Sequence, residues 1–123
     1  MTYSIVARDP ETGEIGVAVE TALPGVGRLC PWAEAGIGAV ATQALVRVSH
    51  GSSGLMLMRN GHSAPQALAA VLAGDPNANI RQLGMVDKDG NAAGHTGANA
   101  IRYAGHHVGV GYSVQANMMA KNT

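Results

Sequence analysis

The stretch "MTYSIVARDPETGEIGVAVETA", residues 1–22, decides the fold because it predicts a β-hairpin that begins with a threonine. Residues 3–8 alternate between two faces, as the residues of a strand do, and residues 15–20 repeat that alternation. The letters DPETG between them are typical of a turn, since the proline presets φ and the glycine accepts a positive φ. The hairpin raises the question whether Thr2 only opens a strand or is the reactive group of an enzyme.

The bulk composition excludes several classes of protein. The chain has 123 residues, and we expect residues 1–123 to form a single domain. Eight Lys and Arg residues balance eight Asp and Glu residues without forming runs, which argues against nucleic-acid binding and against a polybasic membrane helix. The chain shows no signal peptide and no apolar run of about 20 residues, and its single cysteine rules out an internal disulfide framework. We therefore expect a soluble, cytoplasmic protein.

Beyond the hairpin, the sequence predicts an α+β chain whose strands and helices come in blocks. The clearest helix lies in residues 63–74, where Ser63 and Gln66 have capping-box spacing and Gly74 closes the end. The letters HGSSG at residues 50–54 are expected to break the chain. The other expected elements are a Gly/Pro loop at 23–32, a buried strand at 35–44, a short helix from 55 that ends at Gly61, a hairpin at 80–97 and a strand pair within 103–117.

Four segments, taken in order, resemble the DUF1028 family, which is grouped with the N-terminal nucleophile (Ntn) hydrolases. They are TYSIVARDPETGEIGVAV, PWAEAGIGAVATQA, RQLGMVDKDGNAAGHTG and GYSVQAN. The resemblance implies an αββα four-layer sandwich, with two antiparallel sheets between helix layers and a nucleophile on the first strand. It also implies hydrolysis of the C–N bond of a small amide or ureido compound. Since residues 118–123 supply no closing element, the sandwich could be incomplete at the C-terminus.

Thr2 could supply both the nucleophile and the base of such a hydrolase. If Met1 is removed, Thr2 carries a hydroxyl and a free α-amine, whose ordinary pKa is roughly 7.7–8. The amine could take the hydroxyl proton and later return it to the leaving nitrogen. The small side chain at position 2 suits removal of Met1 by an aminopeptidase, whereas a retained Met1 leaves Thr2 without that amine. The alternative is that Thr2 simply favours a strand.

Ten further residues are candidates for binding the substrate or stabilising the oxyanion. Arg8 could bind a substrate carboxylate, and Glu20 could orient the Thr2 amine. Backbone N–H groups near Thr96 and Gly97 could form an oxyanion hole. Each residue also has an ordinary structural explanation: it could be a solvent-facing charge, a buried polar group that is hydrogen-bonded within the fold, or part of a turn at the end of a strand. The full set is Ser4, Arg8, Glu20, Thr42, Gln43, His95, Thr96, Gly97, Gln115 and Asn117.

Polar residues within apolar strands are the second source of these candidates. Thr42 and Gln43 lie in the expected buried strand, so they either brace the sandwich or face a pocket. Gln115 and Asn117 are two residues apart and therefore point to the same face, where both could bind an amide. Ser4 could support the site from the first strand.

Two other kinds of function stay open. The chain could be a non-catalytic ligand-binding protein or an oligomeric scaffold of the same fold. It could also be a cysteine–histidine hydrolase that uses Cys30, although a small buried thiol is the commoner reading. We expect no cofactor and no metal, because His106 and His107 are adjacent and point to opposite faces, and the Gly-x-Gly pairs lack a third glycine. A core without phenylalanine buries little area, so we expect a homodimer, a larger assembly, or a partner segment that covers one sheet edge.

Overall fold

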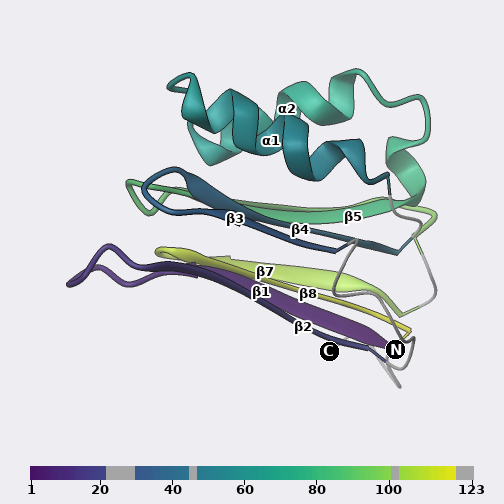
Figure 1. Ribbon diagram of the computed structural model, residues 1–123. Helices are drawn as coiled ribbons and strands as arrows, with labels where there is room; N and C mark the ends of the chain where they lie inside the picture. Colours follow the sequence, from purple (N-terminus) through teal and green to yellow (C-terminus); the bar gives the residue numbers. More distant parts are fainter. Residues whose placement is uncertain (22–29, 45–46, 101–102, 119–123) are drawn as a thin grey trace.

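The fold has three layers, in which a pair of helices covers one sheet and a second sheet lies below the first (Figure 1). The structure is a computed structural model that describes residues 1–21, 30–44, 47–100 and 103–118. Sheet A has the strand order β2-β1-β8-β7, sheet B has the order β3-β4-β5-β6, and all neighbouring strands are antiparallel. The elements are β1 (Thr2–Arg8), β2 (Ile15–Thr21), β3 (Pro31–Glu34), β4 (Gly38–Ala44), α1 (Ser49–Arg59), α2 (Ala64–Ala73), the 3-10 turn η2 (Ala78–Ile80), β5 (Arg81–Asp87), β6 (Ala92–Thr96), β7 (Gly105–Gly109) and β8 (Tyr112–Asn117).

The helix α2 forms for the reason that its sequence predicts. The Ser63 hydroxyl accepts from the Gln66 N–H, and the Gln66 side chain accepts from the Ser63 N–H, which completes the capping box. The apolar faces of α1 and α2 pack on Leu83 and Met85 of sheet B and form the larger core. Among the described residues, no helix is long and apolar enough to cross a bilayer.

The helix α1 begins earlier than the sequence predicts, because the letters HGSSG lie inside it. A Cβ at Gly51 would lie 2.3 Å from the Trp32 ring, and a Cβ at Gly54 would lie 2.9 Å from the end of Met85. These glycines let the helix lie close to sheet B, and this packing outweighs their poor helix propensity. The expected stop is confirmed, since Gly61 follows the helix with a φ of +96°.

The expected hairpins and the expected strand pair within 103–117 are confirmed as β1–β2, β5–β6 and β7–β8. The Gly/Pro loop expected at 23–32 is wrong at its end, where Pro31–Glu34 forms β3, and residues 23–29 of it lie outside the described residues. The strand β3 pairs with the apolar strand β4, so pairing at a sheet edge decides its conformation rather than its own composition.

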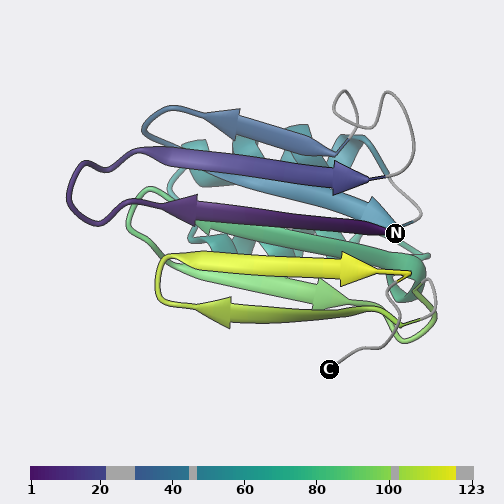
Figure 2. The same ribbon diagram turned by 90° about the horizontal axis from the view of Figure 1, so that it is seen from below.

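The expected αββα four-layer sandwich is wrong. Both helices follow β4 directly along the chain and cover sheet B alone. The described residues place no helix on the outer face of sheet A, which Figure 2 shows from below. After α2, the described chain forms one short 3-10 turn and then strands, each of which pairs with a neighbour in one of the two sheets. No described segment therefore supplies a second helical layer.

Candidate functional site

The space between the two sheets is divided into an apolar half and a polar half. The apolar half surrounds Val6 and is filled from sheet B by the small side chains of Ala39, Ala41 and Val86. The polar half lies toward the end of the sandwich at which β1 begins, and its side chains are almost completely buried. They are Ser4, Gln43, Gln82, Ser113, Gln115 and Asn117.

Thr2 lies at the edge of this polar half. Alternation along β1 places the Thr2 side chain on the same face as that of Ser4, which is buried between the sheets. Its cross-strand neighbours are Thr21 on β2 and Asn117 on β8. The Thr2 and Thr21 hydroxyl oxygens are 3.0 Å apart, and Met1 is half exposed. A partly buried hydroxyl therefore sits beside a second hydroxyl and a buried amide.

Gln82 is the centre of the polar half, and it is absent from the set that the sequence predicted. Its Oε1 accepts from Gln43 Nε2 at 2.8 Å and from Asn117 Nδ2 at 3.1 Å. Its Nε2 lies 3.0 Å from the Thr96 hydroxyl oxygen and 2.9 Å from each of two backbone carbonyl oxygens, so its two hydrogens are shared among three acceptors. One signal could have found Gln82, since it is a polar residue inside an apolar strand, as Gln43 is. Gln82 therefore links the two sheets through Asn117, which is the cross-strand neighbour of Thr2.

Gln115 braces the two strands in the middle of sheet A. Its Nε2 donates to the Ser4 hydroxyl at 2.9 Å, and its Oε1 accepts from the Ser113 hydroxyl. The side chain lies against Gly84 of sheet B, where a Cβ would be 2.1 Å from Gln115 Oε1. Glycine at position 84 therefore makes the room for this amide, and both ends of the amide have partners within the chain.

His106 lies at the edge of the polar half, beside β6. Its Nδ1 lies 2.8 Å from the Thr96 hydroxyl oxygen, which also accepts from Gln82 Nε2. Burial lowers the pKa of His106, and the nearby His95 and His107 lower that pKa further. The imidazole is therefore mainly neutral at pH 7, and the side chains that line the polar half carry no net charge.

Two of the charged candidates lie away from the Thr2 side chain. Arg8 ends β1 six residues after Thr2, a separation of about 20 Å along a strand. Glu20 pairs with Tyr3 and is exposed on the outer face of sheet A. Because Thr2 faces the interior, neither charge contacts its hydroxyl.

Three further candidates serve other parts of the fold. Thr42 faces the helices, and its buried hydroxyl has no hydrogen-bond partner among the described residues. His95 Nε2 lies 2.8 Å from the Ala78 carbonyl oxygen. The Gly97 N–H donates to the Arg81 carbonyl at 2.9 Å, so it is already used and does not offer an oxyanion donor. The predicted residues that the structure does bring to the polar half are Ser4, Gln43, Thr96, Gln115 and Asn117.

Cys30 has the environment of a structural thiol. The residue is 2 % exposed, and burial raises the pKa of its thiol. A raised pKa lowers the fraction of thiolate, which is the nucleophilic form. This environment weighs against a cysteine hydrolase.

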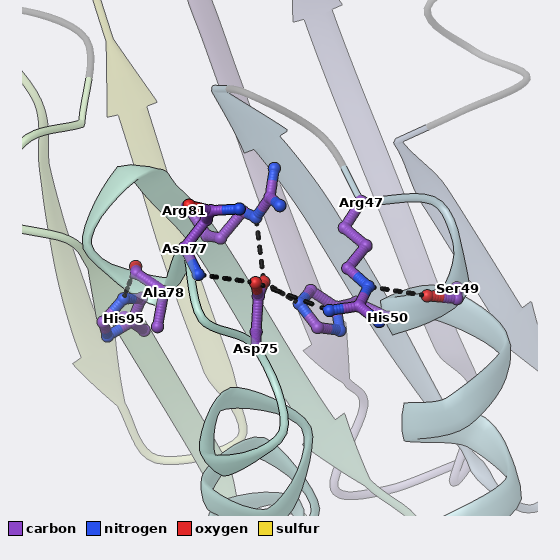
Figure 3. Close-up of polar contacts among 8 residues, drawn as sticks. All are labelled: Arg47, Ser49, His50, Asp75, Asn77, Ala78, Arg81 and His95. Atoms are coloured by element: carbon purple, nitrogen blue, oxygen red, sulfur yellow. Dashed lines mark hydrogen bonds and ion pairs between the residues drawn. The ribbon is translucent and has the colours of Figure 1, made fainter.

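An ion cluster centred on Asp75 lies where α1, the segment after α2 and β5 meet (Figure 3). Asp75 Oδ2 accepts from Arg81 Nε at 2.9 Å and lies 2.7 Å from His50 Nε2, while the Asn77 N–H donates to Oδ1 at 2.9 Å. Arg47 approaches Oδ1 at 3.4 Å. The hydrogen bond from Arg81, together with those from Asn77 and His50, holds the pKa of the Asp75 carboxyl far below its usual value. The cluster stabilises the contact between α1, the segment after α2 and β5 on the helix side of sheet B.

The outer face of sheet A carries an open hollow of about 730 Å³. Its lining is mainly apolar and includes Tyr3, Ile5, Tyr103 and Val114, while Glu20 is the acidic residue that contributes to it. The Thr2 side chain points to the opposite face of the sheet and does not line the hollow. Ser4, Gln115 and His106 also contribute to the lining, so the hollow adjoins strands that carry the polar half.

Comparisons with known proteins identify a family and one solved structure. A family model described as "Family of unknown function (DUF1028)" matches residues 2–123. The crystal structure of protein SPO2555 from Silicibacter pomeroyi, described with the same family model, is similar with a TM-score of 0.92 and 33% sequence identity. The match covers 98% of this chain and 54% of that chain, so this chain spans about half the length of its relative. No curated protein matches the chain.

Proposed function

The chain belongs to the DUF1028 family, and on that premise we propose that it is an Ntn-type amidohydrolase that cleaves the C–N bond of a small amide or ureido compound with Thr2 as its nucleophile. One observation carries the proposal. The Thr2 hydroxyl, at the first position after a half-exposed Met1, faces the interior beside an uncharged, amide-rich cluster. Such a cluster suits a neutral polar substrate, because buried charges need a partner of opposite sign.

Removal of Met1 leaves Thr2 with a free amine, which acts as the base. The amine takes the hydroxyl proton while Thr2 Oγ1 bonds to the substrate carbonyl carbon. The C–N bond then breaks, and the ammonium returns its proton to the leaving nitrogen. Water, activated by the same amine, hydrolyses the ester that remains and restores the hydroxyl.

Two neighbours assist Thr2 in this proposal. The Thr21 hydroxyl, 3.0 Å away, orients the Thr2 hydroxyl. Asn117 lies directly across from Thr2, and one of its two amide hydrogens is held by Gln82. The second hydrogen of Asn117 Nδ2 is our candidate for the oxyanion donor, a role in which one donor typically contributes roughly 3–4 kcal/mol.

The proposal is tested by a pair of variants at position 2, assayed on small primary amides and ureido acids. In protein from which Met1 has been removed, Thr2→Ala should abolish turnover, because no oxygen remains to attack. Thr2→Ser should retain measurable turnover, because it keeps both hydroxyl and amine. Undiminished turnover by Thr2→Ala would refute the proposal.

A second candidate function, a non-catalytic scaffold, is favoured by the hollow on the outer face of sheet A. Tyr3 and Ile5 are 45% and 38% exposed there, and an exposed apolar sheet face is typical of an interaction surface. In this reading a second copy of the chain covers the face. Sedimentation tests it, since Ile5→Lys should convert a dimer to a monomer, and a wild-type monomer at micromolar concentration would exclude it.

A further inference from the structure

The carboxamide of Gln82 has one possible orientation, and this determines the orientation of its neighbours. Its Nε2 contacts the carbonyl oxygens of Gly105 and Ala116, each at 2.9 Å, and a carbonyl oxygen only accepts hydrogen bonds. The atom at that position must therefore be the nitrogen. It follows that Gln82 Oε1 is the atom that faces Gln43 and Asn117, and both of these must present N–H groups to it.

This constraint leaves the Gln43 oxygen without a partner. Gln43 Nε2 is used by Gln82, so rotating the Gln43 amide by 180° would place two oxygens against each other. Gln43 Oε1 is buried, the residue is 1 % exposed, and the oxygen has no hydrogen-bond partner among the described residues. Because buried polar atoms are normally hydrogen-bonded, this oxygen is free to accept a hydrogen bond from a ligand.

The position of Gln43 places this acceptor on the strand that faces Thr2. Asn117 pairs with Thr2 in sheet A, and Gln82 pairs with Gln43 in sheet B. Because Asn117 bonds to Gln82 across the sheets, and β1 packs against β4, these two rows of residues face each other. Gln43 therefore lies across the interior from Thr2, next to the amide that bridges the sheets.

We propose that Gln43 Oε1 is a specificity-determining acceptor that binds the N–H of the substrate, so that the preferred substrate is an uncharged compound with a free carboxamide or ureido NH₂ group. The inference rests on the proposed function in one respect, namely that Thr2 attacks the adjacent carbonyl. Esters and N,N-disubstituted amides lack this hydrogen and leave the acceptor unpaired. A site built around a hydrogen bond discriminates strongly against an analogue that cannot make it.

The test compares three compounds that share one acyl group: propionamide, N,N-dimethylpropionamide and methyl propionate. Their kcat/KM values are measured with the Met1-free wild type, Gln43→Met and Thr42→Val. Gln43→Met should shrink the preference for propionamide over each analogue by about tenfold or more. Thr42→Val is the matched control, since it removes an equally buried, unpaired polar atom from the helix-facing side of the same strand, and it should keep the wild-type preference. An unchanged preference in Gln43→Met would overturn the inference.

Binding to Thr2→Ala, followed by NMR at millimolar ligand, separates the inference from the proposed function. If Thr2→Ala prefers propionamide and Thr2→Ala/Gln43→Met does not, the acceptor role stands even when the wild type shows no turnover. If the wild type hydrolyses propionamide but its preference does not depend on Gln43, the proposed function stands and the inference fails. Binding of neither amide by Thr2→Ala would also overturn the inference, and thermal melts of every variant confirm that each is folded.

Discussion

The hydroxyl oxygens of Thr2 and Thr21 lie 3.0 Å apart across the β1–β2 pair. The two residues are 19 positions apart, and the tight turn at residues 9–13 brings them together. This contact connects the hairpin, which is the clearest feature of the sequence, to the candidate nucleophile. It gives the Thr2 hydroxyl a fixed neighbour at the edge of the polar half.

The first prediction concerns that neighbour. Thr21→Val keeps the shape of the side chain but removes the hydroxyl, so we expect kcat for amide hydrolysis to fall about tenfold, equivalent to about 1.4 kcal/mol of lost orientation. Thr21→Ser keeps the hydroxyl and serves as the control. Equal kcat values for Thr21→Val and the wild type would show that the contact does not orient the nucleophile.

The second prediction contrasts two glutamines that are hydrogen-bonded to each other. Gln82→Met leaves the partners of Gln82 in both sheets unpaired and should lower the free energy of unfolding by roughly 3 kcal/mol or more. Gln43→Met removes an unpaired buried acceptor together with one donor to Gln82 Oε1, which keeps its bond from Asn117, and should change stability by less than about 1 kcal/mol. Urea denaturation measures both. A larger loss for Gln43→Met than for Gln82→Met would contradict the assigned amide orientations.

The third prediction concerns the glycine that makes room for Gln115. In Gly84→Ala the new Cβ would lie 2.1 Å from Gln115 Oε1, whose amide is held at both ends, so we expect a loss of about 1–3 kcal/mol. Gly16→Ala is the matched control in another strand, since a Cβ there meets nothing within 4 Å. Thermal unfolding should therefore separate the two variants clearly. Similar melting temperatures would mean that the sheets can shift apart at Gly84.

The fourth prediction is a pH dependence that originates at Asp75. Its pKa is lowered in the folded protein, chiefly by Arg81, so its contribution to stability is complete above the unfolded pKa of about 3.9 and is lost as the pH falls below that value. Asp75→Asn should cost roughly 2 kcal/mol at pH 7. The difference between wild type and variant should shrink between about pH 4 and pH 2 in urea titrations. A difference that is constant with pH would exclude this carboxylate as the cause.

Local signals in the sequence account for much of the fold. The turn at residues 9–13 predicts the first hairpin, and the capping residues Ser63 and Gln66 predict α2, because each of these signals acts over a few neighbouring residues. The start of α1 could not be predicted this way. Gly51 and Gly54 resemble chain breakers in sequence, and only their contacts with Trp32 and Met85 across the layers explain their helical conformation.

The candidate site was predictable in part for the same reason. Gln115 and Asn117 share a face because strands alternate, and that prediction needs no tertiary structure. The sequence marks Gln82 only as a polar residue in an apolar strand, because its importance comes from partners on other strands in both sheets. The hairpin register places Glu20 near the start of β1, but Glu20 is exposed on the outer face, and Arg8 lies at the far end of β1. Only the family resemblance implies the second helical layer, and no described segment forms it.

The most direct test of the central claim compares Met1-free and Met1-retaining forms of the same protein, each verified by intact mass. Initial rates are measured on one panel of small primary amides and ureido acids. If the Thr2 amine is the base, only the Met1-free form should turn over a member of the panel. Equal rates for the two forms, or no turnover by either, would contradict the account.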